Sequence, residues 1–397
     1  MSGINRPVAA AERTGGAAVV VGGGIAGLAA AAALGGAGWR VTVLEQAPVF
    51  WEAGAGLTLT PNGLRALAGL GIEGAVRDAG WALRPDGVMG SHGERLVRFS
   101  SKVRAMPVVG IHRRSLHGVL VDAASAVVDL RPGCRVLGMD IGAPGGRPAR
   151  VRWREGGADH VMAADLLVGA DGVNSTVRQR VAPAVDVRPS GFAAWRAVVP
   201  DVGSGPDWTA WWGDGAEFGA QRIGPDRVSW HCLFRVDAAA RLDEGGRGLD
   251  EFIAGWPSQV LDLVSRSDPE RILRHDISVA RGEFRSFVAG RTVLVGDAAH
   301  PILPTLSQGA NLALEDGVTL GHLVRGASVD AALRSHDAVR APRARRVAKS
   351  ARALSWIGAG CPRGLGQTVR NRILERLPAQ AVERYISGIT EWDVPVG

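Results

Sequence analysis

Three short runs of the 397-residue chain combine glycine with acidic side chains at spacings that could do chemistry. Residues 22–27 read GGGIAG, residues 169–172 read GADG, and residues 296–301 read GDAAHP. Glycine allows a backbone to turn tightly and to approach a phosphate, and a carboxylate accepts hydrogen bonds from sugar hydroxyls. The chemistry that these residue types favour is the binding of a dinucleotide.

The glycine content of the chain makes the first run weak evidence by itself. Glycine supplies 55 of the 397 residues, about 14% against a usual share of about 7%. About one G-x-G-x-x-G pattern is then expected by chance. The inference therefore depends on the elements that surround the run.

Those elements form a strand, a turn, a helix and a second strand. Residues 17–21 are a short β-branched run, typical of a strand buried on both faces, and residues 28–34 are an Ala-rich helix. Residues 40–45 form a second strand that ends in Glu45. A βαβ unit of this length, with an acid at its end, predicts dinucleotide binding but leaves open whether the nucleotide is FAD or NAD.

Each residue of this unit has a physical task. Gly22 and Gly24 allow the turn against a pyrophosphate, and Gly27 allows the helix to pack closely on the strand. The N-terminus of the helix that follows offers unpaired N–H groups to an anion. Glu45 is placed to accept hydrogen bonds from a ribose.

The two later runs repeat the design of an apolar strand followed by an acid. Residues 166–169 lead into Asp171 and Gly172, and residues 291–295 lead into Asp297. An acid at the carboxyl end of a parallel strand can reach a ligand that lies across the sheet edge. We therefore expect all three runs at one edge.

Charge and cysteine usage exclude several classes of function. The net charge is +7, but its densest cluster is spread round a predicted helix, so we expect a solvated face and no nucleic-acid site. That cluster consists of Arg340, Arg343, Arg345, Arg346, Lys349 and Arg352. Cys134, Cys232 and Cys361 are isolated, which fits reduced thiols in a cytoplasmic protein and no metal site.

One uncharged segment could be mistaken for a membrane helix. Residues 17–34 carry no charge, and their length reaches the minimum of about 18 residues for a span. Four glycines interrupt the segment, however, and glycine is a poor helix former. We therefore expect a strand, a turn and a helix, and no membrane span.

Together, the three runs and the segment Gln308-Gly309-Ala310-Asn311 resemble the single-component FAD-dependent monooxygenases of the para-hydroxybenzoate hydroxylase and salicylate hydroxylase type. The resemblance extends from about residue 17 to about residue 352, and residues 340–343 (RAPR) match the family's Arg-x-Pro-Arg pattern. It implies an α/β FAD-binding Rossmann-like domain from residues 17–186 and 286–350. It further implies an inserted mixed β-sheet substrate domain over 187–285, with C-terminal helices over 351–397.

By this resemblance, FAD is the cofactor and NADH or NADPH is a transient co-substrate. The implied FAD contacts are Gly22, Gly24, Ile25, Ala26, Gly27, Glu45, Arg113, Asp171, Gly172, Asp297, Gly309, Ala310 and Asn311. Arg114 beside Arg113 leaves that assignment ambiguous. Ser307 stands where family members often have glycine, which puts the geometry of the flavin-facing loop in question.

The implied reaction is insertion of one oxygen atom of dioxygen into an electron-rich aromatic or indole-like molecule through a flavin C4a-hydroperoxide. Alternatives are epoxidation of an indole or alkene, a halogenase or reductase on the same FAD fold, and a non-enzymatic flavoprotein. Pro304, Arg196 and His231 are the candidates for the reacting edge. Six tryptophans in the substrate segment fill a sheet core or line a wide aromatic pocket, and they are Trp195, Trp208, Trp211, Trp212, Trp230 and Trp256.

Overall fold

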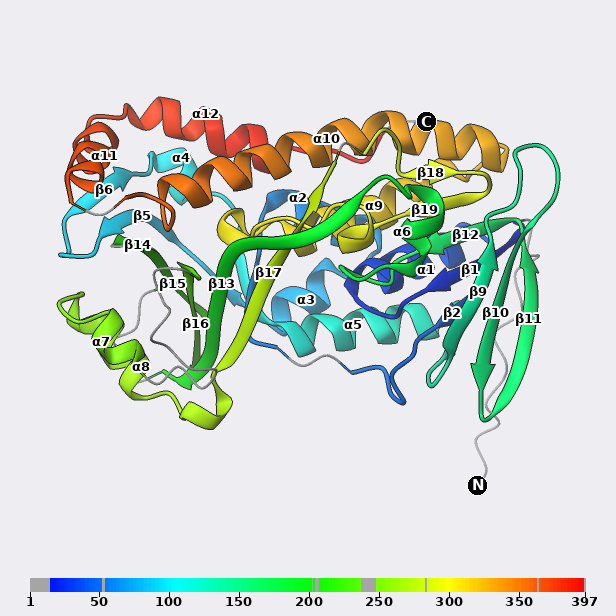
Figure 1. The fold of residues 1–397 in the computed structure, drawn as a ribbon, viewed down its shortest axis with the longest axis horizontal. Helices are drawn as coiled ribbons and strands as arrows, with labels where there is room; N and C mark the ends of the chain where they lie inside the picture. Colours follow the sequence, from blue (N-terminus) through cyan, green and yellow to red (C-terminus); the bar gives the residue numbers. More distant parts are fainter. Residues whose placement is uncertain are drawn as a thin grey trace, which may run out of the picture.

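A mainly parallel six-stranded sheet forms one half of the molecule, on the right in Figure 1. The computed structural model describes residues 15–51, 54–201, 203, 207–213, 215–236, 248–282, 284–362 and 364–395. The strand order is β18-β19-β12-β1-β2-β8, and only β18 pairs antiparallel to its neighbour. Its strands are β1 (Ala17–Val21), β2 (Arg40–Leu44), β8 (Asp129–Arg131), β12 (Leu166–Gly169), β18 (Val288–Ala289) and β19 (Thr292–Leu294).

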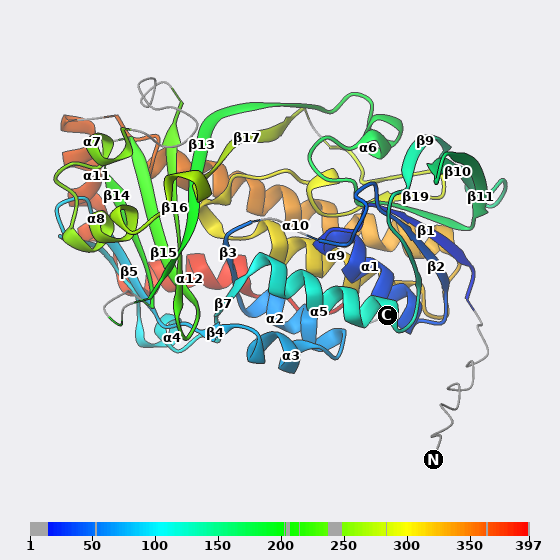
Figure 2. The same cartoon turned by 90° about the horizontal axis from the view of Figure 1, so that it is seen from below.

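Helices α1 (Ile25–Gly36) and α9 (Gly309–Leu323) pack against each other beside this sheet (Figure 2). Small residues allow the close approach, because a Cβ added to Gly317 would lie 2.6 Å from the amide nitrogen of Ala30. The long helix α10 (Val329–Ile357) packs on α9 and continues toward the other half of the molecule (Figure 1). These three helices therefore connect the six-stranded sheet to the rest of the fold.

A seven-stranded mixed sheet forms the other half, in the order β17-β13-β16-β15-β14-β5-β6. Strands β5 and β6 come from a segment far earlier in the sequence than the other five, so the second sheet draws on both parts of the chain. The strands are β5 (Pro85–Gly90), β6 (Arg95–Arg98), β13 (Asp186–Pro200), β14 (Trp208–Gly213), β15 (Ala216–Gly224), β16 (Arg227–Arg235) and β17 (Leu273–Arg281).

One face of this second sheet is a sealed aromatic core. Trp195 stacks on Phe234 with ring centroids 3.9 Å apart, and Trp211, Trp230 and Trp256 lie in the same buried cluster. Helices α7 (Leu249–Phe252) and α8 (Ser258–Ser265) contribute the cover of that cluster. Of the two alternatives, core filling holds for Trp195, Trp230 and Trp256, whereas Trp211 belongs to the buried cluster and also lines a cavity together with Trp208.

The remaining elements are short sheets and helices around these two halves. The small sheets are β3 (Gly56–Leu59), β7 (Val109–His112) and β4 (Trp81–Ala82), and β9 (Arg135–Asp140), β10 (Ala149–Glu155) and β11 (Ala158–Ala164). The helices are α2 (Pro61–Gly69), α3 (Glu73–Asp78), α4 (Ser101–Arg104), α5 (Arg113–Ser125), α6 (Thr176–Val181), α11 (Leu365–Glu375) and α12 (Ala379–Thr390). Within the described ranges, no helix has the length and apolar character needed to cross a bilayer.

Candidate functional site

The three glycine-containing turns meet at the carboxyl ends of β1, β12 and β19, as expected. The amide of Ala170 donates to the carbonyl of Val21 at 2.8 Å, and the amide of Val295 donates to the carbonyl of Gly169 at 3.0 Å. Parallel pairing brings these strand ends to one edge. The sheet thus gathers residues that are more than 270 positions apart in sequence, such as Gly22 and Gly296.

Glycine is required at two positions of the first turn. Gly22 has φ +105°, and a Cβ there would lie 2.4 Å from the carbonyl oxygen of Ala170. A Cβ on Gly27 would lie 1.9 Å from the carbonyl oxygen of Gly22. No side chain caps α1 at Gly24. The turn into α1 is therefore packed closely on the backbone of Gly22 and Ala170, and the N–H groups of the first turn of the helix remain available to a ligand.

Two polar side chains fix the middle of this turn. The Glu45 carboxylate accepts from the amides of Gly23 at 2.7 Å and Ala47 at 2.8 Å. The buried imidazole of His117, on α5, donates through Nε2 to the carbonyl oxygen of Gly23 at 2.8 Å. Glu45 is half-buried at the end of β2, where sequence placed it.

Asp171 is occupied with its own chain in this structure. Its carboxylate accepts from the hydroxyl of Ser175, from the amide of Thr176 at 2.7 Å and from the amide of Val177 at 3.2 Å. It thereby satisfies the amino end of α6. Gly172 follows with φ +76° and open space where a Cβ would lie, so its backbone angle is what favours glycine there.

Arg178, which the sequence did not single out, links the second and third turns. Its guanidinium donates to the carbonyls of Val173 at 2.6 Å and Ala298 at 3.2 Å. Burial lowers the pKa of this guanidinium, and the carboxylates of Asp171 and Asp297 oppose that effect. The side chain of Asp297 is exposed and makes no hydrogen bond or ion pair with any described residue, which leaves its carboxylate available to a ligand.

A second uncapped helix end faces the same region. No side chain caps α9 at Gln308, and a Cβ on Gly309 would meet open space. Gly309 and Ala310 are half-buried, whereas Asn311 is fully buried and anchors the loop before it. The Asn311 amide donates to the carbonyls of Ser307 at 2.6 Å and Thr58 at 3.0 Å.

Ser307 adopts the left-handed backbone conformation, which glycine accommodates without a penalty. Its φ is +54°, a value that no other non-glycine residue of the described chain shares. The departure from the family pattern therefore leaves the loop in the conformation that glycine favours, at the expense of backbone strain in this chain.

A buried ion-pair cluster lies beneath this loop. Glu315 and Asp316, consecutive residues of α9, are fully buried, and both pair with Arg340 of α10. Arg343 donates to Glu315 at 2.5 and 2.6 Å. Arg340 and Arg343 are both buried, so the expectation of a solvated face is wrong for them, whereas Arg346, Lys349 and Arg352 are exposed. Sequence contained one sign of this, because Arg340 falls on the helical stripe that Leu333, Ala344 and Val347 define.

The cluster extends to the third turn and to two histidines. Asp316 accepts from the amide of Gly296 at 2.9 Å and from Nε2 of His300 at 2.6 Å. Burial alone would lower the pKa of His300, but the Asp316 carboxylate raises it above its ordinary value. His336 on α10 shows the opposite outcome, because burial lowers its pKa to about 4 although Asp316 opposes the shift.

Hydrogen bonds between amide and hydroxyl side chains connect the buried ion-pair cluster to Thr60 and Asn62, which follow strand β3. Asn62 donates to Glu315 at 2.6 Å and to Gln308 at 2.9 Å, and Gln308 donates to the hydroxyl of Thr60 at 3.0 Å. These side chains are buried. The loop before α9 is thus held by the hydrogen bonds of Gln308 to α2 and to Thr60, the residue just before α2.

The seven-stranded sheet supplies the opposite wall with cationic and imidazole groups. Arg196 lies opposite His231 across β13 and β16, and Ala194 lies opposite His275 across β13 and β17. Directly opposed residues of antiparallel strands share a face, so Arg196, His231 and His275 project to the same side. Ala194 packs with Leu303 there, which shows that this side faces the loop before α9.

On this face of the seven-stranded sheet, the positive charge of Arg196 is not paired with a carboxylate of the described chain. Arg196 makes no hydrogen bond or ion pair within the described chain, and its pKa is lowered by burial and by Arg113, with Asp297 opposing. Burial, Arg196 and Arg113 also lower the pKa of His275. Arg114, by contrast, lies over the exposed ring of Trp51 at 4.7 Å. Of the two neighbouring arginines, Arg113 is the one whose charge acts on Arg196 and His275.

His231 lies on β16 of the seven-stranded sheet, and Pro304 lies on the loop before α9. His231 Nε2 is 3.8 Å from the buried Glu217 carboxylate, and its ring fills the space that a Cβ on Gly219 would occupy. Pro304 is half-buried at the start of a 3-10 turn, Pro304–Leu306. The Thr305 hydroxyl binds the Ser355 hydroxyl of α10 at 2.6 Å, which holds the turn in place.

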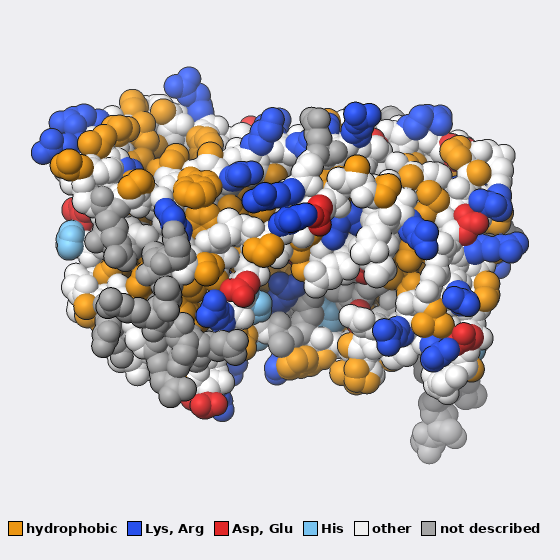
Figure 3. All heavy atoms as spheres, viewed as in Figure 1, with side chains coloured by type: hydrophobic (Ala, Val, Ile, Leu, Met, Phe, Trp, Pro, Cys, Tyr) orange, Lys and Arg blue, Asp and Glu red, His pale blue; other side chains and the backbone are white. Residues whose placement is uncertain are grey.

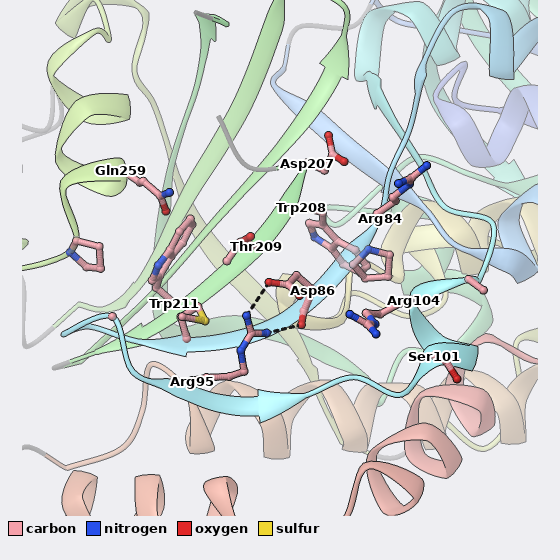
Figure 4. A pocket seen from close by; sticks show the side chains of 15 residues that line it. Arg84, Asp86, Arg95, Ser101, Arg104, Asp207, Trp208, Thr209, Trp211 and Gln259 are labelled. Atoms are coloured by element: carbon pink, nitrogen blue, oxygen red, sulfur yellow. Dashed lines mark hydrogen bonds and ion pairs between the residues drawn. The ribbon is translucent and has the colours of Figure 1, made fainter. Parts of the chain in front are cut away.

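A cavity of about 830 Å³ lies elsewhere, at the outer edge of the seven-stranded sheet (Figure 4). Its lining includes Arg84, Asp86, Arg104, Trp208 and Gln259, from strands β5 and β14 and helices α4 and α8. Neither Arg196 nor Pro304 lines it. This cavity is therefore separate from the strand-end turns and is not the candidate site.

The arrangement fits a bound dinucleotide with a flavin ring. Two uncapped helix ends, of α1 and α9, and the unpaired Asp297 carboxylate meet the needs of a pyrophosphate, an anionic ring and a polyhydroxyl chain. Among the residues that the structure describes, no cluster of His, Cys, Asp or Glu could hold a metal ion.

Comparison with known proteins gives a consistent result. Residues 16–351 match the family described as FAD binding domain. The chain is 34% identical to aurachin C monooxygenase/isomerase of Stigmatella aurantiaca over 327 residues, covering 79% of this chain and 82% of that protein. It is 35% identical to 3-amino-4-hydroxybenzoate 2-monooxygenase of Streptomyces cremeus, covering 79% and 80%. The crystal structure of Klebsiella pneumoniae HpxO with FAD and uric acid superposes with a TM-score of 0.83 at 26% identity, covering 95% and 97%.

Replacing Ser307 by glycine should stabilise the protein. Glycine removes the cost of a left-handed residue, about 1–2 kcal/mol, and part of that gain is lost to the freer unfolded chain. We expect the free energy of unfolding to rise by about 0.5–1 kcal/mol in denaturant titrations. Ser307→Ala keeps a Cβ at the same φ and is the matched control. An equal gain in both variants would contradict a backbone origin.

Stability should fall as the pH is lowered from 6.5 toward 4, in part through His336. Folded His336 is neutral until its pKa of about 4, whereas the unfolded residue takes up a proton near pH 6.5. The unfolded state therefore binds more protons in this window, which favours unfolding. Unfolding free energies at pH 6.5, 5.5 and 4.5 should show a shallower slope in His336→Gln than in wild type or in His92→Gln, at an exposed histidine. Equal slopes in all three proteins would refute the assignment.

Proposed function

We propose a substrate class and a site for this chain, which belongs to the FAD-binding-domain family of class A FAD-dependent aromatic monooxygenases. The chain is an FAD-dependent monooxygenase. It uses NADH or NADPH and dioxygen to insert one oxygen atom into an electron-rich aromatic small molecule. The observation that supports this proposal is that two uncapped helix ends and the exposed Asp297 carboxylate lie near the loop before α9, on which the sheet face that carries Arg196 packs.

In this proposal the turns of the six-stranded sheet hold FAD. The amino end of α1, at Gly24, Ile25 and Ala26, binds the pyrophosphate, while Gly22 and Gly27 permit the close backbone approach. Glu45 fixes the Gly23 amide and accepts from the adenosine ribose with its remaining lone pairs. Bound flavin supplies hydride acceptance and dioxygen activation, which no side chain of the chain can supply.

The third turn and α9 hold the rest of the cofactor. Asp297 accepts hydrogen bonds from the ribityl chain, and the amides of Gly309, Ala310 and Asn311 stabilise negative charge at the pyrimidine edge of the ring. Asp171 and Gly172 shape the passage between the turns, with Asp171 acting through its bonds to α6. Arg113 contributes positive charge from the far side of the cleft.

The cationic wall indicates how a substrate is oriented. A desolvated guanidinium without a partner favours an anionic or phenolic group at Arg196. The named substrate of the Streptomyces cremeus relative, an aminohydroxybenzoate, carries such groups. His231, with Glu217 behind it, is positioned to accept a proton from a hydroxyl. Pro304 closes the cleft at the reacting edge.

The domain boundaries form part of the proposal. Residues 17–186 and 286–350 make the FAD-binding domain, residues 187–285 make the substrate domain, and residues 351–397 make a C-terminal helical segment. Strands β5 and β6 join the substrate sheet from inside the first segment.

The reaction is tested by turnover with the purified protein. FAD absorbance is recorded first, and then NADH and NADPH oxidation is followed with aminohydroxybenzoates, phenols, indoles and polyenes, with products identified by mass. A stimulated oxidation with a product mass gain of 16 is the expected result. Halide incorporation would favour the halogenase alternative, and a product that gains hydrogen without oxygen would favour a reductase. Failure to bind added FAD would overturn the proposal.

Replacing Asp297 by alanine should weaken FAD binding about 10- to 100-fold, because a hydrogen bond to a charged group is worth about 1.5–3 kcal/mol. The dissociation constant is measured by flavin fluorescence on the deflavinated protein. Asp159→Ala, at an exposed carboxylate of the small β9–β11 sheet, is the control and should bind FAD as wild type does. Unchanged affinity in Asp297→Ala would show that the ribityl contact lies elsewhere.

A further inference from the structure

Helix α11 carries its aliphatic side chains on the outside. Leu365, Val369 and Ile373 are spaced four residues apart and are 85%, 55% and 58% exposed, and Leu377 continues the row at 42%. Residues four apart on a helix lie on one face. These four residues are called the α11 stripe; the three on the helix span about 12 Å at 1.5 Å per residue, and Leu377 lies two residues beyond its end.

The opposite face of α11 is fixed to the protein by apolar and polar contacts, and Leu374 packs there on the buried cluster of Leu96, Val97 and Trp212. Arg370 is buried and donates to the carbonyls of Ile357 at 3.3 Å and Gly358 at 3.1 Å. Asn371 donates to the carboxylate of Glu94 at 3.0 Å. The exposed aliphatic row is therefore additional to the apolar contact that α11 already buries, and the inward hydrogen bonds of Arg370 and Asn371 hold it toward solvent.

The surroundings of the stripe are cationic. Arg372 and Arg376 lie beside it on α11 and its end, and Arg384 lies on the neighbouring α12, all three exposed. Glu375 is the exposed acid of the same helix. Figure 3 shows hydrophobic side chains next to Lys and Arg side chains at the end of the molecule that carries α11 in Figure 1. A contiguous apolar patch of this kind marks an interaction surface.

We propose that the α11 stripe and its flanking arginines dock this protein onto the surface of an anionic lipid bilayer. Aliphatic side chains enter the boundary between headgroups and acyl chains, and the arginines pair with lipid phosphates. An 11-residue helix is too short for a span of about 20 residues. It therefore lies on the membrane surface.

Charge favours a bilayer over a second copy of this chain. A two-fold dimer built on the stripe would bring the same arginines of both copies together, and like charges across an interface are unfavourable. A polyanionic surface removes that repulsion and satisfies the arginines. The proposal concerns the outer surface of the C-terminal helices and stands independently of the oxygenation chemistry.

The test uses full-length protein with FAD added and vesicle flotation. We expect binding to vesicles of equal phosphatidylglycerol and phosphatidylcholine, weak binding to phosphatidylcholine alone, and loss of binding at high salt. Leu365→Ser with Ile373→Ser should weaken binding at least tenfold. Arg372→Gln with Arg376→Gln should weaken it roughly fivefold per arginine.

Matched controls lie at the opposite end of the molecule. Val161→Ser removes an aliphatic side chain that is 66% exposed on β11, and Arg152→Gln removes an exposed arginine on β10. Both should bind vesicles as wild type does. Far-ultraviolet circular dichroism checks that every variant is folded. Equal binding to both vesicle types, no binding at all, or a dimer in sedimentation that Ile373→Ser dissociates would each overturn the proposal.

Discussion

The pairing of two consecutive buried carboxylates with two buried arginines is the interaction on which the site depends. Glu315 and Asp316 lie in the middle of α9, and Arg340 and Arg343 reach them from α10. Losing one partner of such a cluster costs about 3–5 kcal/mol, because the remaining charge stays buried. The same two carboxylates also accept from the amide of Gly296 and from the side chain of Asn62. One electrostatic cluster therefore sets the third turn, the loop before α9 and the position of α10 together.

This cluster and the hydrogen bonds around it explain why the loop before α9 keeps its conformation although the backbone of Ser307 is strained. The loop is tied below by Gln308 and Asn311 and on its flank by Thr305, so the surrounding contacts determine its conformation. Strain persists where neighbouring structure over-determines the backbone. Arg343 also donates to the carbonyls of Ile389 and Glu391, which carries the same constraint to the C-terminal segment.

The strand-end turns were predictable from sequence because their cause is local. Gly22 and Gly27 are adjacent to the strand and helix that require them, and the α/β fold with its inserted sheet is confirmed by the structure and its relatives. The arginine cluster was not predictable in the same way. Arg340 meets Asp316 only because α9 and α10 pack, and a charge count along one helix does not show its partner on another. The sequence could not decide between a core and a pocket for the tryptophans for a related reason, because alternation along β13 gives two faces but does not show which face α8 covers.

The order of the six-stranded sheet has a consequence for how the chain folds. Strand β12 is flanked by β1, some 145 residues earlier, and by β19, some 125 residues later, and the second of these follows the whole seven-stranded sheet. During synthesis the first two-thirds of the chain leave the ribosome with one edge of β12 unpaired. Because long-range parallel pairing is slow, that edge stays open until β19 has been made. The six-stranded sheet thus contains both the first and the last strand of the described chain, β1 and β19.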